Sequence, residues 1–345
     1  MHQHRFAIAT VSLGWHESHS LTEKLQAASK HGYQGVEMVY GDLEREATAQ
    51  NKSIEDCAAS VKALLDELKL KVVSLVSFEN YEGSLVPLVQ RLGKAVKWVH
   101  LARTLQAEFI QIPASYEITS LRLSEDEIVE ELRLLADCGL PRAGTNDATI
   151  TFAYENLSWS VRTSTWQHLL YMKRRVARPN FKLCLDTYHI LTKLWGECTV
   201  PSGRLLNGDA ALEADLRHMV HEILPEEIGF VQLSDAEHMK PPIAPAELRK
   251  LGKHYAEYWS AVGRLFPLET DEGAYLPMIG LCHTWLVDLG WTGWVSMETF
   301  YKTMADEDKR PDHWAERGAK SWSKLKAQME SYSHEDVQPP VKSRI

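Results

Sequence analysis

The stretch PNFKLCLDTYHILTKLW, residues 179–195, joins a short apolar run to the start of an amphipathic segment. The run from Phe181 to Leu185 has the length and composition of a buried strand. It ends on Asp186, and His189 follows three residues later. Asp186 either caps the helix that follows or stands with His189 at the mouth of a site, and this stretch alone leaves both interpretations open.

Runs of the same kind recur along the whole chain, and longer amphipathic segments separate them. The predicted strands are residues 6–10, 35–40, 71–78, 108–114, 149–156, 181–187, 228–235 and 293–300. Between them, segments such as 54–70 and 212–224 carry apolar residues at helical spacing. Eight alternating strand–helix units predict parallel strands that close into a (β/α)8 TIM barrel, an α/β fold. An open doubly wound sheet could contain the same number of strand–helix units. It is less favoured, because no Gly-x-Gly-x-x-Gly motif of dinucleotide-binding sheets follows the first strand.

The chain is expected to form a single catalytic domain, residues 1–331, without a linker. The interval 236–275, between the seventh strand and the next helix, is the longest such interval and predicts an insertion that caps the substrate. The polar, proline-containing end, residues 332–345, predicts a flexible tail.

Composition excludes several classes of protein. The net charge of −9 over 345 residues offers no electrostatic footprint for nucleic acid or an anionic membrane. No apolar span of transmembrane length and no signal peptide occur, and the five cysteines form no Cys-x-x-Cys pair. A cytoplasmic protein that acts on a small molecule is expected, and its oligomeric state, a homodimer included, stays open.

Oxygen-bearing side chains end the last four strands, where chemistry takes place in such barrels. They are Glu155, Asp186, Gln232 and Glu298, and the second strand contributes Glu37. Taken singly, each is more often a helix cap or a solvated group. Together they form an all-oxygen set that suits Mn²⁺, Mg²⁺ or Co²⁺, and a cation would offset the repulsion between carboxylates in a dry barrel mouth. The pattern therefore predicts one divalent metal ion.

Three further residues are candidates for work on the substrate. His189 is placed to act as a general acid or base, although a histidine packed at the start of a helix is an equal alternative. Ser260 and Arg264 are four residues apart and share one face if their segment is helical. An arginine there would bind a carboxylate or phosphate of the substrate, and the alternative is a surface ion pair.

Several long segments resemble the fungal 3-dehydroshikimate dehydratases, which lie within the xylose isomerase-like TIM barrels. In chain order these are IQIPASY, FAYENLSWS, RPNFKLCLDTYHI, FVQLSDAE, GRLFPLETDEGAYLP and GWVSMETF, and the resemblance runs from about residue 6 to about residue 330. It implies a single metal ion on the residues that end the last four strands. It also implies that His189 transfers a proton and that Ser260 and Arg264 bind the substrate carboxylate.

One segment departs from the family pattern. After the third strand the family has Gln-Pro-Phe and then a basic residue before an aromatic-Glu-Gly, whereas this chain has LVSFENYEGSL, residues 75–85. Val76 and Ser77 replace Gln-Pro, Asn80 replaces the basic residue, and Tyr81 is kept as a predicted substrate-binding residue. We expect changed hydrogen bonding to the hydroxyls of the substrate and unchanged metal chemistry.

The resemblance implies a metal-dependent lyase that converts 3-dehydroshikimate, or a closely related cyclic hydroxy-keto acid, to protocatechuate. His189 and Glu37 are the predicted catalytic residues. The main alternative is an isomerase or epimerase of a sugar or hydroxy-ketone, as in fungal secondary metabolism. An abasic-site endonuclease would need histidine zinc ligands and a basic groove, which the acidic chain disfavours, and a barrel without activity is the last alternative.

Overall fold

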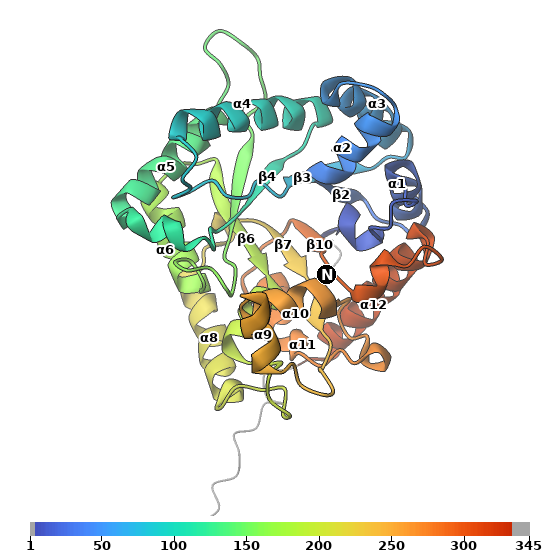
Figure 1. Ribbon diagram of the computed structural model, residues 1–345, viewed down its shortest axis with the longest axis vertical. Helices are drawn as coiled ribbons and strands as arrows, with labels where there is room; N and C mark the ends of the chain where they lie inside the picture. The colour runs from blue at the N-terminus through green and yellow to red at the C-terminus, as the bar shows by residue number, and fades with distance from the viewer. Residues whose placement is uncertain (1–3, 333–345) are drawn as a thin grey trace, which may run out of the picture.

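Eight short strands with almost no exposed residues pair side by side in parallel and close into a barrel (Figure 1). The computed structural model describes residues 4–332. The barrel strands are β1 (Arg5–Ala9), β2 (Gly35–Val39), β3 (Lys71–Val76), β4 (Phe109–Pro113), β5 (Thr151–Glu155), β6 (Phe181–Asp186), β7 (Ile228–Leu233) and β10 (Trp294–Met297). Strands covered on both faces need apolar residues throughout, which is why they were visible as apolar runs. The predicted (β/α)8 barrel is confirmed.

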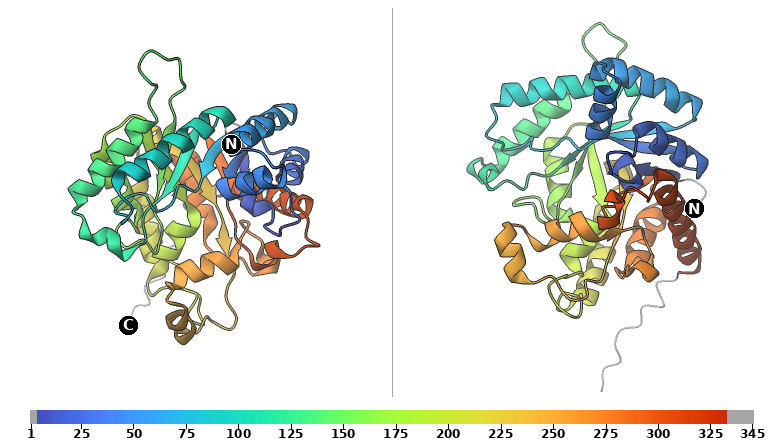
Figure 2. Two further views of the ribbon diagram at one scale, coloured as in Figure 1. Left: turned by 45° about the horizontal axis from the view of Figure 1, so that its top comes forward. Right: turned by 45° about the vertical axis from the view of Figure 1, so that its right-hand side comes forward.

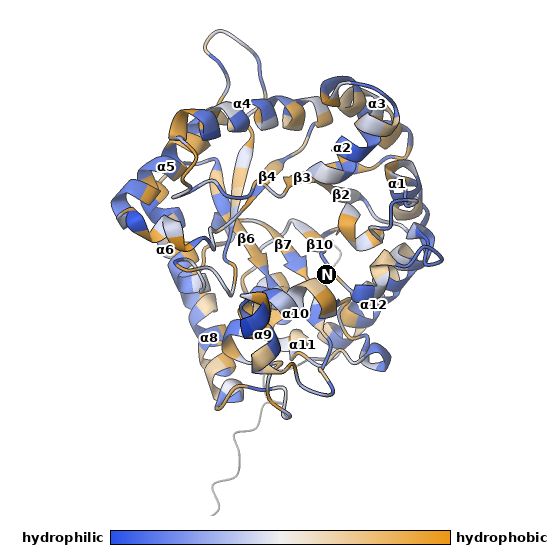
Figure 3. Ribbon diagram, viewed as in Figure 1, coloured by the Kyte–Doolittle hydropathy of each residue, from blue (hydrophilic) through white to orange (hydrophobic). Residues whose placement is uncertain are grey.

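Helices surround these strands on all sides (Figure 2). They are α1 (Leu21–Lys30), α2 (Tyr40–Ala49), α3 (Ile54–Glu67), α4 (Leu88–Leu105), α5 (Glu125–Cys138), α6 (Trp166–Val176), α7 (Thr187–Leu194), α8 (Gly208–Glu222), α11 (Met278–His283) and α12 (Pro311–Ser331). Figure 3 shows them banded in blue and orange, as expected of helices with one face on the barrel and the other in water. Among residues 4–332, no helix is both long enough and apolar enough to cross a membrane.

A layer of side chains fills the barrel interior below the strand ends. It consists of Ala7, Val73, Phe109, Ala153, Cys184, Phe230 and Trp294. β2 contributes Gly35 next to Trp294, where a Cβ atom would lie 2.9 Å from the indole ring. The packed interior leaves the carboxyl ends of the strands as the place for a site.

The segment 236–275 is not a bare loop. It contains α9 (Pro245–Leu251) and α10 (Tyr255–Gly263), which lie together in Figure 1. The two-residue strands β8 (Asp235–Ala236) and β9 (Arg264–Leu265) pair antiparallel at its base. The Tyr188 hydroxyl of α7 donates to the Ala256 carbonyl at 2.7 Å, which ties α10 to the helix that follows β6. The role of the segment 236–275 in capping the substrate stays a prediction. The predicted tail, residues 332–345, lies outside the described residues except for residue 332.

Candidate active site

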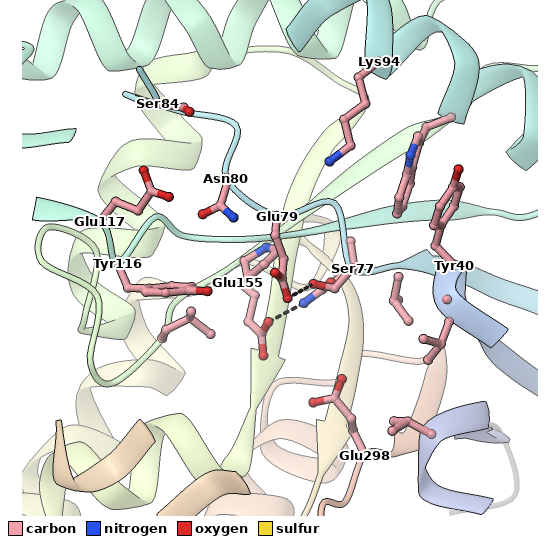
Figure 4. Close-up of a pocket in the computed structure, with 18 of the residues that line it drawn as sticks. Tyr40, Ser77, Glu79, Asn80, Ser84, Lys94, Tyr116, Glu117, Glu155 and Glu298 are labelled. Atoms are coloured by element: carbon pink, nitrogen blue, oxygen red, sulfur yellow. Dashed lines mark hydrogen bonds between the residues drawn. The ribbon is translucent and has the colours of Figure 1, made fainter. Parts of the chain in front are cut away.

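A cavity of about 1300 Å³ opens at the carboxyl ends of the strands (Figure 4). Its deep end is lined by Gln111, Glu155, His189, Ser260, Arg264 and Glu298. Figure 4 shows the carboxylates of Glu155 and Glu298 pointing into the same lower part of the cavity. The strand ends, α7 and α10 together position these side chains. We call these six residues, together with Asp186, the acidic centre.

Asp186 serves two purposes at once. It is the last residue of β6 and is fully buried. Its Oδ1 accepts a hydrogen bond from the backbone N–H of Tyr188 at 2.6 Å and caps α7. Its Oδ2 pairs with the guanidinium of Arg264. The helix cap is therefore confirmed, and Asp186 also lies beside His189 and Arg264, while its role in a site stays a prediction.

His189 faces the acidic centre through one particular nitrogen. Its Nδ1 accepts a hydrogen bond from the backbone N–H of Ser158 at 3.2 Å, so in the neutral ring the proton is on Nε2. Nε2 lies 3.4 Å from Glu155 Oε1 and 3.9 Å from Asp186 Oδ2. Burial lowers the pKa of His189 to about 3, which keeps the imidazole neutral. A neutral ring with its N–H on the side of the centre is placed to donate a hydrogen bond there.

Glu155 is held by a residue that the sequence analysis missed. Gln111 of β4 donates from Nε2 to Glu155 Oε2, whereas Glu155 Oε1 has no hydrogen-bond partner among residues 4–332. Burial, and then the charge of Glu298, raises the pKa of Glu155 well above its ordinary value. The signal for Gln111 was a lone amide within the apolar run FIQIP, residues 109–113.

The residues present fit a divalent cation. Glu155, Asp186 and His189 offer ligand atoms that all lie within 4.8 Å of one another, and the unpartnered Glu155 oxygen is among this group. Burial raises the pKa of Glu298 to about 7, so this carboxyl too lacks full compensation by a positive charge. Because the proton on Nε2 blocks coordination by His189 in this tautomer, the carboxylates are the better candidates for ligands.

Gln232 and Glu37 form a pair beneath the acidic centre. The Gln232 amide donates from Nε2 to Glu37 Oε2 at 2.9 Å, and its Oε1 accepts from Cys184 Sγ at 3.1 Å. Both residues are fully buried, and burial raises the pKa of Glu37 well above its ordinary value. The structure thus turns the Gln232 amide oxygen toward Cys184, and its predicted place among the metal ligands stays a prediction.

Arg264 is the cation of the acidic centre. It is 2% exposed and lies between the rings of Tyr188 and Phe300, with its guanidinium carbon 4.9 and 5.1 Å from their centroids. Besides Asp186, it pairs with Glu298 Oε2 at 3.1 Å. The alternative of a surface ion pair is wrong, because this pair is buried.

The comparison with known proteins assigns the family. The model of the xylose isomerase-like TIM barrel matches residues 25–325. A 3-dehydroshikimate dehydratase from Neurospora crassa is 34% identical over 339 residues, which cover 93% of this chain and 93% of that enzyme. The chain belongs to the fungal 3-dehydroshikimate dehydratase family of xylose isomerase-like TIM barrels.

Solved structures agree on the barrel. A xylose isomerase-like TIM barrel/4-hydroxyphenylpyruvate dioxygenase fusion protein superposes with a TM-score of 0.74 at 23% identity, over 98% of this chain and 46% of that protein. The IOLI protein, solved with a zinc atom, superposes with a TM-score of 0.67 at 13% identity, over 96% of this chain and 99% of that one. At these identities the likeness shows the fold.

Two predicted site residues of this dehydratase family member lie away from the cavity wall. Tyr81 is buried, its hydroxyl donates to the Glu131 carbonyl at 2.7 Å, and the Arg91 guanidinium lies over its ring. The Tyr81 hydroxyl is therefore engaged by α5, and the predicted contact of Tyr81 with the substrate stays a prediction. Glu37, at 0% exposed, also does not border the cavity.

The departures from the dehydratase pattern do border the cavity. Val76, Ser77 and Asn80 all line it, and Ser77 Oγ donates to Glu79 Oε1 at 3.2 Å (Figure 4). Ser260 lines it as well, from α10, on the same side as Arg264. Changes at Val76, Ser77 and Asn80 are therefore placed where they alter the surroundings of a bound substrate.

Proposed function

We propose that the protein is a divalent-metal-dependent lyase that dehydrates 3-dehydroshikimate, or a closely related cyclic hydroxy-keto acid, to protocatechuate. The observation that carries the proposal is the buried acidic centre at the strand ends, with His189 Nε2 at 3.4 Å from the unpartnered oxygen of Glu155. The Neurospora crassa relative, named as this dehydratase, supports the reaction. The isomerase alternative is not favoured.

Dehydration removes a proton from the carbon next to the ketone and expels a hydroxyl group from the following carbon. The carboxylates of Glu155, Asp186 and Glu298, with Gln232, are the residues that would hold the metal ion. When bound, it supplies positive charge that stabilises the negative oxygen developing at the ketone.

His189 is the residue that we assign to proton transfer. It takes the proton from the carbon next to the ketone and returns it to the departing hydroxyl, which leaves as water, so that the imidazole is neutral again at the end. The Ser158 backbone N–H on Nδ1 keeps the hydrogen on Nε2 in this structure, so taking the proton at Nε2 requires the other tautomer. Ser260 borders the same end of the cavity and is assigned to orienting the substrate. Arg264 offsets the charges of Asp186 and Glu298, and could bind a substrate carboxylate only after one of these ion pairs opens.

The test is turnover of 3-dehydroshikimate by protein stripped of metal and reloaded with Mn²⁺ or Mg²⁺. We expect the absorbance of protocatechuate to appear with metal and to vanish with a chelator. His189→Gln should lower kcat by roughly 10² to 10⁴ while Mn²⁺ binding is retained. His168→Gln is the matched control, because that histidine pairs with Glu125 away from the cavity.

Two results would overturn parts of this proposal. Absence of aromatic product with every metal would remove the dehydratase assignment. A rate that is unchanged by the chelator would remove the metal from the mechanism and leave the lyase.

A further inference from the structure

Gln111 is a polar residue at an apolar position of the barrel interior. Alternate residues of a strand face the same side, so Gln111 follows Phe109, whose ring belongs to the interior layer. The pairing of Gln111 with Ala153 of β5 fixes its backbone on one side. On the other side, the Phe78 backbone N–H donates to the Gln111 carbonyl at 2.9 Å. Gln111 is 2% exposed and borders the cavity, so the barrel holds this amide at the deep end of the cavity.

The side-chain amide of Gln111 is held at one end. Its Nε2 donates to Glu155 Oε2, a bond that the dashed line at Glu155 marks in Figure 4. Its Oε1 has no hydrogen-bond partner among residues 4–332. A buried acceptor without a partner destabilises the folded state, and an apolar side chain of the same size would avoid this cost. Packing therefore does not explain the amide, whereas its bond to Glu155 does.

This hydrogen bond makes the two oxygens of Glu155 different. The terminal torsion of a glutamate is broad and roughly two-fold, so a carboxylate without partners can present either oxygen. In this protein Gln111 occupies Oε2. Oε1 lies 3.4 Å from His189 Nε2 and has no hydrogen-bond partner in the described part of the chain. The oxygen that Gln111 leaves free is thus the one beside His189.

The charge of the donor matters as much as its position. Arg264 pairs with Asp186 and Glu298, whereas no lysine or arginine within residues 4–332 forms an ion pair with Glu155. A neutral amide satisfies Oε2 without neutralising the ionised carboxylate. A lysine in the same place would also satisfy Oε2, but its charge would compete with a cation for Glu155. A glutamine therefore keeps the negative charge of Glu155 available at Oε1.

We propose that Gln111 is a positioning residue of the acidic centre, which holds Glu155 Oε2 through a neutral donor and so reserves Oε1 for the divalent cation. The cation itself rests on the proposed function. Hydrogen bonds of this kind orient the ligands of metal sites, and their loss typically lowers metal affinity by roughly ten- to a hundredfold. The role of Gln111 is therefore visible in metal binding, without turnover.

The experiment measures Mn²⁺ binding by calorimetry and records the electron paramagnetic resonance spectrum of the bound ion. Gln111→Met has nearly the same length and removes the donor, whereas Gln111→Lys keeps a donor and adds a charge. We expect Gln111→Met to weaken Mn²⁺ binding roughly tenfold or more and to alter the spectrum. Gln111→Lys should weaken binding at least as much. Gln90→Met is the control and should match wild type, because Gln90 borders the cavity from α4 but is exposed to solvent.

Thermal unfolding separates this role from a merely structural one. Without metal, Gln111→Lys should have a Tm at or above that of wild type, because the lysine pairs with Glu155. Mn²⁺ should raise the Tm of wild type and have little effect on Gln111→Lys, since a ligand stabilises only the state that binds it. If Gln111→Met does not fold, Gln111→Lys decides alone.

The outcomes distinguish the role of Gln111 from the proposed reaction. Weaker Mn²⁺ binding by both Gln111 variants, with no turnover of 3-dehydroshikimate by wild type, supports the positioning role and removes the reaction. Wild-type Mn²⁺ affinity in either folded Gln111 variant overturns the positioning role and leaves the reaction. An equal loss of affinity in Gln90→Met, or absence of Mn²⁺ binding by wild type, also overturns it.

Discussion

Asp186 shows why a single residue supported two interpretations. A carboxylate has two oxygens, and here one caps α7 while the other meets Arg264 in the acidic centre. A cap and a site residue are therefore compatible wherever a strand ends directly at a helix. The sequence pattern was sufficient to find Asp186, Glu155 and Glu298, because each stands at the end of an apolar strand.

Other residues could not be placed from the sequence, because their partners are distant in the chain. The Tyr81 hydroxyl donates to the backbone carbonyl of Glu131, fifty residues away, so the local motif carried no information about the direction of this side chain. Gln111 lies in an apolar strand, and only the barrel shows that its amide meets Glu155. The engagement of Arg264 with two carboxylates likewise depends on the folding of the segment 236–275.

At the same scale, Glu82 makes stability depend on pH. It is buried, accepts hydrogen bonds from the Ser115 backbone N–H and the Tyr154 hydroxyl, and burial raises its pKa from 4.5 to about 7. A raised pKa means that the folded state favours the protonated form. The stability from Glu82 is thus fully present below pH 4.5 and is lost as the pH rises through about 7.

Glu82→Gln removes this titration. We expect the free energy of unfolding of wild type to fall relative to the variant between pH 5 and pH 8, by roughly 2–3 kcal/mol. Urea unfolding at several pH values measures it, with the exposed neighbour Glu79→Gln as the control. Parallel pH profiles for wild type and Glu82→Gln would show that the buried carboxyl is not titrating.

At the scale of elements, one buried carboxylate organises the segment after β7. Asp235 Oδ1 accepts from the backbone N–H groups of Ala236, Tyr275 and Leu276 at 2.8, 3.1 and 2.8 Å, and Oδ2 accepts from Leu268 at 3.2 Å. These bonds join the two ends of the interval 236–275. From the sequence, only the unusual length of this interval was apparent. Its helices were harder to predict, since each is short.

Asp235→Ala should leave four backbone donors without an acceptor. We expect a loss of several kcal/mol in the free energy of unfolding, at about 1–3 kcal/mol for each buried donor that water cannot reach. Hydrogen exchange should accelerate in residues 264–276. Glu237→Ala is the control, because its ion pair with the partly exposed Lys302 contributes about 1 kcal/mol or less. Similar stability and exchange in the two variants would contradict this role for Asp235.

At the scale of the molecule, the barrel was predictable because the strand–helix alternation repeats over the whole chain. Each observed barrel strand begins within two residues of its predicted start, for example β6 at Phe181–Asp186 against 181–187. The size of the cavity was not predictable, since it results from the face that α4 presents to α2 and from the loop after β3. The acidic centre follows from the barrel, and the rest of the cavity follows from the packing around it.

The most direct test of the account is the rate of protocatechuate formation from 3-dehydroshikimate by metal-loaded wild type and Glu155→Gln. Glu155 ends β5, lines the cavity and carries the unpartnered oxygen, so its replacement removes the charge on which the proposed chemistry depends. We predict product formation by wild type and a loss of roughly a hundredfold or more in the variant. Glu108→Gln, at the opposite end of the barrel beside Trp294, should match wild type. No product from wild type, or equal rates for wild type and Glu155→Gln, would contradict the account.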